Sequence, residues 1–400
     1  MTQTADAKPT TARDAGEVAL MIIAGECLPS NSGATYEVKN PATGKVVATV
    51  ARGTPDDVNK AVAAAKAVEK QWAETPAEDR AALLFKGIEL LEQNKKEIAK
   101  LLSQEQGKPV FEANGEVHHM IHGLTFYAGL ASKIRGSQVP VPPAMGKHSY
   151  GMIVRRPVGI SVGITPWNLP LTLMGTKVGP ALIAGCPIII KPAQTTPLST
   201  LRVIELLNQA GIPAGVLQCV TGFGSELGDP ATVPEKPRVR MGPLHAEFQR
   251  AEIEDQLADA VAKGAKVVLG GKRPEGLDEG FYFEPTIVEN VSDDSKLVTE
   301  EVFGPVLPMF KYKDLDEAIA RVNASEWGLG SSIWTNNMIW ANRAVRDIEA
   351  GVTWVNTIHY GYDELPFGGV KASGIGREHG PEAVDFYLED KGVVFGGLEG

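Results

Sequence analysis

The sequence predicts an α/β protein with a parallel sheet that is covered by helices on both faces, and three observations support this. Strand-like and helix-like segments alternate between residues 158 and 220, and parallel strands need such helical crossovers. The chain has 400 residues, which is enough for two or three domains. Hydrophobic residues make up 43% and charged residues 22% of the chain, a composition typical of globular proteins.

Charge and cysteine content exclude several classes of protein. The formal net charge is −10, so we expect no nucleic-acid partner. The cysteines Cys27, Cys186 and Cys219 are too few and too widely spaced for a disulfide framework or a zinc knuckle. Residues 1–16 resemble a flexible tail and not a signal peptide, and the apolar run 178–190 is too short to span a bilayer. We expect a soluble, cytoplasmic protein without a membrane partner.

Residues 54–94 have a helical pattern, which begins with Thr54 as a cap and Pro55 in the first turn. A second helix is predicted from Pro76 onward. Residues 139–158 alternate in strand fashion around several prolines, which predicts an exposed ribbon of the kind that often joins subunits.

The middle of the chain predicts a βαβ unit followed by a further helix and strand. Its first strand, at 158–164, is expected to be buried. The remaining segments are a helix at 171–184, a strand at 187–191, a helix at 197–210 and a strand at 216–220. Beyond residue 235 the sequence predicts a charged helix at 244–263, a strand at 266–269 and further alternating elements up to residue 390.

A glycine turn and a lysine are candidates for nucleotide binding. Gly222, Gly224 and Gly228 follow the strand at 216–220, and glycines let backbone N–H groups approach a pyrophosphate. The spacing departs from G-x-G-x-x-G, so an ordinary turn explains it equally well. Lys191 ends the strand at 187–191, and ligands bind at strand ends in doubly wound sheets.

Taken together, these motifs resemble the aldehyde dehydrogenase superfamily, and the resemblance extends from about residue 20 to residue 394. The matching segments, in chain order, are Asn40-Pro-Ala-Thr-Gly, Thr165-Pro-Trp-Asn-x-Pro, Ala184-Gly-Cys-Pro, Lys191-Pro-Ala, Thr221-Gly-x-Gly, Met241-Gly-Pro-Leu, Glu284-Pro-Thr, Glu300-Glu-Val-Phe-Gly-Pro-Val, Trp327-Gly-Leu and Pro366-Phe-Gly-Gly-Val-Lys-Ala-Ser-Gly.

The resemblance implies a Rossmann-type dinucleotide domain, an α/β catalytic domain and a β-ribbon oligomerisation arm. It also implies oxidation of a small-molecule aldehyde with NAD or NADP, in a homo-oligomer or with a full-length homologue as partner. The corresponding segments are 17–138 and 157–230 for the nucleotide domain, 139–156 and 386–400 for the arm, and 240–385 for the remnant of the catalytic domain.

Individual roles follow from the same resemblance. Asn168 would donate a hydrogen bond to the oxyanion of the tetrahedral adduct. Lys191 would bind the adenosine ribose, next to Gln194, where the family has an acid; a neutral amide repels a 2′-phosphate less. The other cofactor-binding residues would be Pro166 and Trp167 on the nicotinamide side, Glu301 and Phe303 at the nicotinamide ribose and ring, and Gly222 and Gly224 at the phosphates.

Two catalytic groups are missing from the sequence. The family uses a cysteine nucleophile and a glutamate base, which lie between the T-G-x-G turn and the M-G-P-L segment. Here 17 residues separate Gly224 from Gly242, fewer than the ~30 of one βαβ unit. The sequence therefore predicts a truncated nucleotide domain with an open strand edge. The segment Leu269-Gly-Gly-Lys is predicted to be a structural turn, and the three cysteines are predicted to be structural.

Three other features are predicted to be structural, or leave the choice open. His118 and His122 have the i, i+4 spacing of metal ligands but no third ligand, which predicts a solvated helix face. The segment His379-Gly-Pro is predicted to be a helix cap and not to supply a base. Phe367 and Lys371 fit a substrate loop and a packing role equally well.

Four functions remain open at this point. The leading one is an aldehyde dehydrogenase homologue that is impaired or inactive. The second is a non-catalytic regulatory or structural partner of a full-length homologue. The third is an enzyme that transfers hydride without a covalent adduct, and the fourth is the product of a defective or altered gene.

Overall fold

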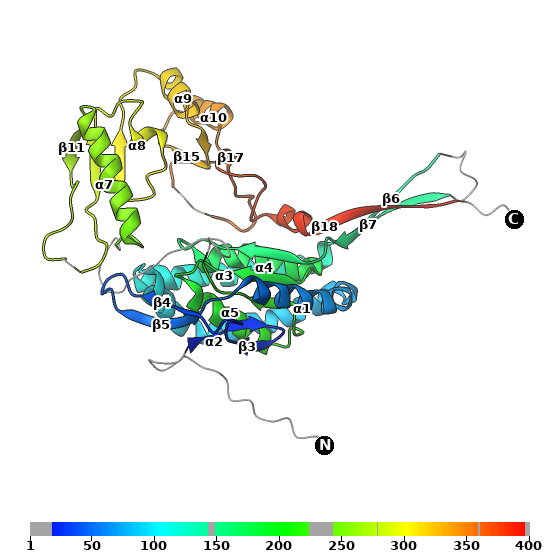
Figure 1. The fold of residues 1–400 in the computed structure, drawn as a ribbon. Coiled ribbons are helices and arrows are strands. Elements are labelled where there is room, and N and C mark those ends of the chain that lie inside the picture. Colours follow the sequence, from blue (N-terminus) through cyan, green and yellow to red (C-terminus); the bar gives the residue numbers. More distant parts are fainter. Residues whose placement is uncertain (1–17, 143–148, 224–242, 278, 359–360, 397–400) are drawn as a thin grey trace.

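The computed structural model describes residues 18–142, 149–223, 243–277, 279–358 and 361–396. The predicted tail at 1–16 and Gly224 lie outside the described residues. Figure 1 shows a first lobe built from the N-terminal half of the chain, a second lobe built from residues 243–358 together with 370–371, and a long ribbon that projects from the first lobe.

The first lobe is centred on a five-stranded sheet. Its order is β3-β2-β10-β9-β8, in which β10, β9 and β8 are parallel and β2 and β3 add an antiparallel edge. The strands are β2 (Met21–Ile23), β3 (Glu26–Leu28), β8 (Ser161–Ile164), β9 (Ile188–Lys191) and β10 (Leu217–Cys219). The predicted α/β fold with parallel strands at its centre is confirmed.

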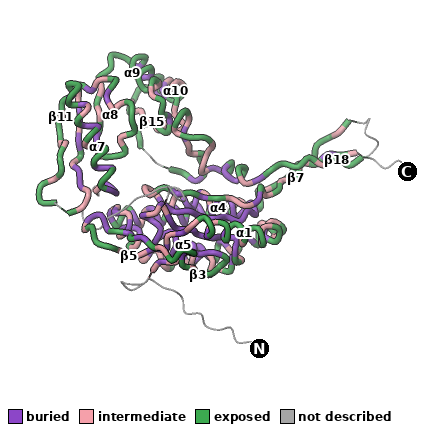
Figure 2. Tube along the Cα trace, in the orientation of Figure 1, coloured by how far each residue is buried: buried purple, intermediate pink, exposed green. Residues whose placement is uncertain are grey.

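Helices cover the two faces of this sheet unequally. The main core joins Ile188, Ile190 and Leu217 to four helices, while Ile189 and Val220 pack with Ala61 of a single helix on the opposite face. The single helix is α1 (Pro55–Glu74), and the four are α2 (Ala77–Gln106), α3 (Val110–Gly129), α4 (Pro170–Ala184) and α5 (Pro197–Gln209). Figure 2 shows the buried residues concentrated in this lobe.

The prediction of a buried strand at 158–164 is wrong. β8 is the last strand of the sheet, and Val162 and Ile164 are 60% and 56% exposed. Val162 pairs with Ile189, so it shares the face that α1 covers. α1 packs over Ile189 and leaves β8 uncovered, which is the open edge that the short 224–242 interval predicts.

Helix boundaries differ from the predictions where loops pack tightly. The pattern at 54–94 contains the end of α1, whose cap is Thr75, and the start of α2 after Pro76. The predicted helix at 244–263 is α7 (Glu247–Ala262). It begins three residues late because Leu244, His245 and Ala246 are buried before the helix and Ala246 has extended backbone angles.

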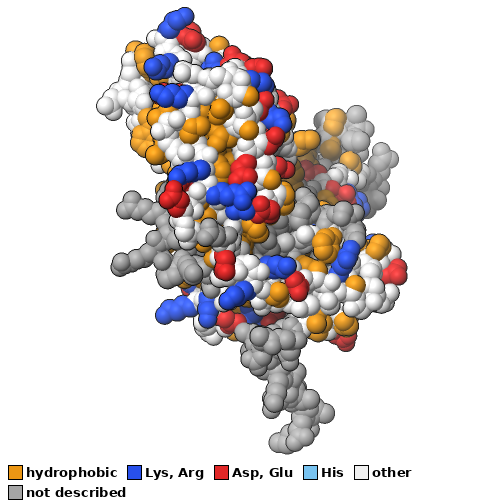
Figure 3. Space-filling view, turned by 60° about the vertical axis from the view of Figure 1, so that its left-hand side comes forward, with side chains coloured by type: hydrophobic (Ala, Val, Ile, Leu, Met, Phe, Trp, Pro, Cys, Tyr) orange, Lys and Arg blue, Asp and Glu red, His pale blue; other side chains and the backbone are white. Residues whose placement is uncertain are grey.

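The second lobe contains three small sheets with a limited core. These are β11-β12-β13, the parallel pair β15-β16 and the antiparallel pair β14-β17. Its strands are β11 (Lys266–Leu269), β12 (Thr286–Glu289), β13 (Val306–Met309), β14 (Trp327–Gly328), β15 (Gly330–Ile333), β16 (Val352–Val355) and β17 (Val370–Lys371), and its other helices are α8 (Lys296–Thr299), α9 (Leu315–Asn323) and α10 (Met338–Asp347). Apolar side chains remain on its surface, among them Trp334, Met338 and Ile339, and Figure 3 shows such side chains on this lobe.

The ribbon predicted at 139–158 is present. β7 (Tyr150–Pro157) pairs along its whole length with β18 (Leu388–Phe395) and, near one end, with β6 (Ser137–Val139). A separate sheet near the N-terminus consists of β1 (Val18–Ala19), β4 (Thr35–Lys39) and β5 (Val46–Ala51). The short 3-10 helices η1 (Ala131–Lys133) and η3 (Pro381–Tyr387) follow α3 and precede β18. Among the described residues, every helix is too short or too polar to cross a membrane.

Candidate functional site

The predicted cofactor residues gather at one edge of the first-lobe sheet. Because β8, β9 and β10 are parallel, the segments that follow them begin at the same edge. Thr165 N donates to Lys191 O at 3.1 Å, and Val220 N donates to Ile190 O at 3.0 Å. The structure thereby brings together the Pro166–Trp167–Asn168 loop, the Lys191–Gln194 turn and the Thr221–Gly222 turn.

The Lys191 turn is buried and polar. Lys191 is buried at the end of β9, and its charge acts on Cys219, although burial raises the pKa of that thiol more strongly. Gln194 is half-buried next to Thr195 and Thr196, whose hydroxyls are buried and have no hydrogen-bond partner among the described residues. Unpaired buried hydroxyls are costly unless something binds them, so this turn fits the polar end of a ligand such as an adenosine ribose.

The glycine turn is held against the N-terminal part of the lobe. Gly53 N donates to Thr221 O at 2.8 Å, and the Thr221 hydroxyl donates to Ala51 O at 2.7 Å. A Cβ on Gly53 would come within 2.6 Å of Thr221 O, so only glycine permits this approach. On the far side, Arg52 lies 4.4 Å from the centre of the Phe223 ring.

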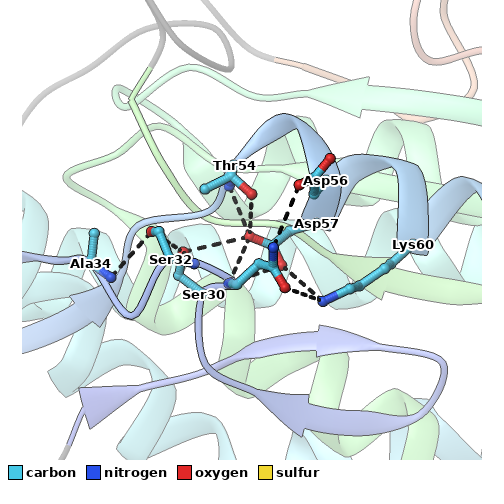
Figure 4. Close-up of polar contacts among 8 residues, drawn as sticks. Ser30, Ser32, Ala34, Thr54, Asp56, Asp57 and Lys60 are labelled. Carbon is cyan, nitrogen blue, oxygen red and sulfur yellow. Dashed lines mark hydrogen bonds and ion pairs between the residues drawn. The ribbon is translucent and has the colours of Figure 1, made fainter.

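Asp57 fixes the start of α1, directly after Gly53. Figure 4 shows its buried carboxylate accepting hydrogen bonds from Thr54 N and Oγ1, each at 2.9 Å, and ion-pairing with Lys60 at 3.7 Å. Asn31 N donates to the same carboxylate at 3.1 Å. Burial raises the pKa of Asp57, but the hydrogen bonds from Thr54 and Asn31 lower it below the ordinary value. This cluster anchors the segment on which the glycine turn rests.

A buried ion pair holds the Asn168 loop. Lys108 Nζ contacts Glu116 and donates to Asn168 O at 2.9 Å, while Glu116 accepts from Leu171 N at 2.8 Å and Thr172 N at 3.2 Å. Glu116 therefore caps the N-terminus of α4, where a negative charge is favoured. The Oδ1 atom of Asn168 is buried without a partner among the described residues. Its backbone is thus fixed while its amide has hydrogen-bonding capacity left for a ligand.

The two lobes meet at an aromatic cluster, which we define as Trp167, His245 and Phe303. The imidazole of His245 lies flat on the indole of Trp167, with ring centres 3.5 Å apart and planes at 15°. The ring of Phe303 lies edge-on to Trp167 at 5.3 Å. Gln249, in α7, contacts His245 Nδ1 through its oxygen and donates to Phe303 O through its nitrogen.

Glu301 lies close to this cluster but is exposed. Gln256 Nε2 donates to Glu300 Oε2 at 3.1 Å and to Glu301 O at 3.5 Å. Phe303 has a φ of +41°, in the left-handed region, which is unfavourable for a bulky side chain. The predicted pair Glu301 and Phe303 is therefore presented by a constrained loop beside Trp167.

Cys219 lies beside the site, because it ends β10 and the charge of Lys191 acts on it, but it is fully buried. Cys27 is half-buried in β3. Cys186 is buried after α4, where it contacts Tyr387 O at 3.3 Å, and Cys219 is buried in β10. Burial raises the pKa of both Cys186 and Cys219, which is the opposite of what a reactive thiolate needs. The prediction that they are structural agrees with these positions.

His122 and His379 both contact Asp363. His118 and His122 are exposed on α3, as predicted, and the ring of His122 also contacts the carboxylate of Asp363. The segment His379-Gly-Pro caps η3 as predicted, since Gly380 is the cap, and His379 Nδ1 lies 2.9 Å from Asp363 Oδ1. Asp363 thus joins α3 to the segment before η3. The described residues contain no cluster that could hold a metal ion.

The loop at 366–374 shows packing contacts. Lys371 Nζ donates to Asn323 O at 2.8 Å and pairs with Glu349 at 2.7 Å, which favours a packing role. Phe367 lines a cleft of about 350 Å³ with Val162, Lys177 and Phe386, so a substrate role for it stays open. The predicted turn after Leu269 is present, with positive φ at Gly270 and Gly271.

Sequence reasoning missed Lys108, Glu116, His245 and Gln249. Lys108 and Glu116 belong to no motif, and only the fold brings them to residues 168–172. His245 and Gln249 directly follow the Met241-Gly-Pro-Leu segment. The one available signal was His245 itself, a polar aromatic residue that follows the largely apolar residues 241–244 at the start of a predicted helix.

The chain matches the family model described as "Aldehyde dehydrogenase family" over residues 28–234 and 230–393. The mitochondrial aldehyde dehydrogenase of Leishmania tarentolae is 33% identical over 475 residues, which cover 94% of each chain. That alignment leaves about 100 positions without a residue from this 400-residue chain. The two family-model matches meet at residues 230–234, in the interval where the sequence predicts a missing segment.

Two solved structures share the fold. A 3,6-anhydro-L-galactose dehydrogenase in complex with NADP superposes with a TM-score of 0.89 and 30% identity, covering 94% of this chain and 100% of the other. A betaine aldehyde dehydrogenase from Staphylococcus aureus in complex with NAD⁺ gives a TM-score of 0.90 and 26% identity, covering 94% of this chain and 96% of the other.

Proposed function

Because the chain belongs to the aldehyde dehydrogenase family and has its NAD(P)-binding fold, we propose that it keeps the dinucleotide site and has lost the family's covalent catalysis. The single observation that carries this proposal is the setting of the three cysteines: Cys186 and Cys219 are buried with raised thiol pKa values, and Cys27 lies in β3. Without a nucleophile no thiohemiacetal forms, and the loss of such a group costs on the order of 10⁴ to 10⁶ in rate.

The base is missing as well. Glu116, which lies beside the Asn168 loop, already binds Lys108 and the N-terminus of α4. Glu378 is paired with Lys177. A carboxylate held by such partners accepts a proton from water poorly, which supports an impaired or inactive enzyme.

The adenosine end of the site is intact. Lys191, Gln194 and the hydroxyls of Thr195 and Thr196 would hold the ribose, and the Gly222 turn would lie against the phosphates. A bound NAD(P) would supply a hydride acceptor. Gln194 is neutral, so NADP is at least as acceptable as NAD; its amide carries no charge to repel a 2′-phosphate.

The test combines binding with turnover. Isothermal titration with ADP-ribose, NAD⁺ and NADP⁺ should show binding, and Lys191→Ala should weaken the binding of all three by about tenfold. Lys100→Ala, an exposed lysine on α2, is the matched control.

Turnover is then measured as nicotinamide reduction with short aliphatic and aromatic aldehydes, with and without prior thiol alkylation. No reduction above the buffer rate supports the proposal. Reduction that alkylation abolishes would overturn it, because one of the three cysteines would then be the nucleophile. Reduction that survives alkylation would instead support hydride transfer without a covalent adduct.

A second candidate function is favoured by the ribbon. β7 and β18 pair over eight residues, and Tyr150 stacks on Phe395 with ring centres 4.7 Å apart. Met152, Val394 and Phe395 are exposed on it, and apolar residues on a projecting ribbon fit a subunit contact. We propose that this ribbon joins a second copy or a full-length homologue. Sedimentation equilibrium of the chain alone, and co-purification with the homologue, distinguish the two partners.

A further inference from the structure

His245 is nearly completely buried, at 3% exposure, in the aromatic cluster. Its imidazole covers the face of Trp167 at 3.5 Å, the separation of two stacked rings in direct contact. A second planar ring cannot enter between them. The ring of Phe248 lies edge-on at 5.4 Å and supports the imidazole from its own helix.

The imidazole is also tied to the residue that the resemblance assigns to the nicotinamide ring. Gln249 bridges His245 Nδ1 and the carbonyl of Phe303. Because the Gln249 oxygen only accepts, Nδ1 is the protonated nitrogen and Nε2 is the free acceptor. Nε2 is buried and has no hydrogen-bond partner among the described residues.

The unpaired Nε2 atom indicates that the space beside Trp167 does not satisfy the hydrogen-bonding groups of His245. A buried acceptor without a donor costs roughly 1–3 kcal/mol. The imidazole therefore stacks well on Trp167, while one of its nitrogens stays without a hydrogen bond. Burial lowers the pKa of His245 to about 4. The ring is therefore neutral at neutral pH. It matches the nicotinamide of NAD⁺ in being flat and aromatic, but it lacks the positive charge of that ring.

We propose that His245 is an internal plug, which covers the face of Trp167 beside Phe303 and excludes the nicotinamide ring, so that a dinucleotide binds through its adenosine end alone. The proposal rests on the proposed function, because it presupposes an intact adenosine site. The plug can move without unwinding a helix, since His245 precedes α7 and Ala246 has φ −154° and ψ 158°.

The test compares NAD⁺ with ADP-ribose, which lacks only the nicotinamide. In the unaltered protein the two should bind with equal affinity, because the ring makes no contact. In His245→Ala, NAD⁺ should bind about tenfold more tightly than ADP-ribose, whose own affinity stays unchanged. His118→Ala removes an exposed histidine of α3 and should behave like the unaltered protein.

Each outcome has a definite meaning. A tenfold preference for NAD⁺ in the unaltered protein, or equal affinities in His245→Ala, would overturn the plug while leaving the proposed function in place. Binding of neither ligand to any variant would overturn the proposed function and the plug that depends on it.

A measurement on the unaltered protein keeps the proposal testable if His245→Ala does not fold. At about pH 6, where an ordinary histidine is partly charged, His245 should stay neutral and show ring protons shifted upfield by the indole. The upfield shift separates it from His119, whose pKa burial also lowers. Saturating NAD⁺ should leave this resonance in place. Its absence from the spectrum, or its loss when NAD⁺ is added, would contradict the plug.

Discussion

The three thiols have different surroundings, and these predict different reactivity. Cys186 and Cys219 are buried and their pKa values are raised by burial, so little thiolate forms at neutral pH, whereas Cys27 is half-buried in β3. We expect a disulfide reagent to titrate one thiol rapidly in the native protein and all three after denaturation. Peptide mass spectrometry should place the rapid modification on Cys27, and rapid labelling of Cys219 would contradict the structure.

Asp57 offers a test of the cluster under the glycine turn. Asp57→Asn removes the charge that Thr54, Asn31 and Lys60 stabilise, and should lower the free energy of unfolding by about 2–3 kcal/mol. Asp56→Asn, at an exposed neighbour, should change it by less than about 0.5 kcal/mol. Urea denaturation measures both.

The same substitution has a defined dependence on pH. The pKa of Asp57 is lower in the folded protein than its ordinary value of 3.8. The carboxylate therefore contributes its stability above pH 3.8 and loses it as the pH falls through the folded pKa. The difference between the unaltered protein and Asp57→Asn should shrink in acid; a difference that grows in acid would contradict the assignment.

At the scale of the strands, a substitution in β8 should lower the free energy of unfolding less than one at the paired position in β9. Val162→Lys places a charge on an exposed edge position, so the free energy of unfolding should change by less than about 1 kcal/mol and aggregation should decrease. Ile189→Ala, at the paired but buried position, should cost about 2–5 kcal/mol. Chemical denaturation and light scattering check the pair, and a large cost at Val162 would mean that the edge is covered.

The contact of Asp363 with His122 and His379 ties the segment before η3 to the first lobe. Burial raises the pKa of Asp363, but the hydrogen bonds from His379 and His122 lower it below its ordinary value. Asp363→Asn should loosen this tie, seen as faster proteolysis of residues 361–380 and a loss of roughly 1–3 kcal/mol. His122→Ala, which removes one contact at a half-exposed ring, should have the smaller effect.

At the scale of the whole molecule, both the β8 edge and the second lobe expose apolar side chains. The second lobe holds its apolar residues in a small core around Ile253 and Val288 and leaves Trp334, Met338 and Ile339 exposed. Exposed apolar surface of this kind marks a partner contact or a tendency to aggregate. This agrees with the proposal that the chain works next to another subunit.

Local sequence signals predicted much of the fold because they act over a few residues. Thr54 with Pro55 marked the start of α1, and the strand and helix periods around Lys191 placed β9 and α5 to within two residues. The strand at 158–164 was predicted to be buried because its residues are largely apolar, but Val162 and Ile164 are exposed. Apolar composition alone does not show whether a neighbouring element covers a strand. Burial depends on that neighbour, which lies elsewhere in the chain.

The sequence by itself determined the family, and it predicted the site residues from Pro166 to Phe303 and the lack of a nucleophile, since these follow from residue identities and their order. Only the tertiary structure decided that Glu116 caps α4, that Asp363 joins His122 to His379, and that His245 covers Trp167. These contacts join residues that are far apart in the chain, and no local preference encodes them. They form because burial excludes water and each polar group must then find its partner within the fold.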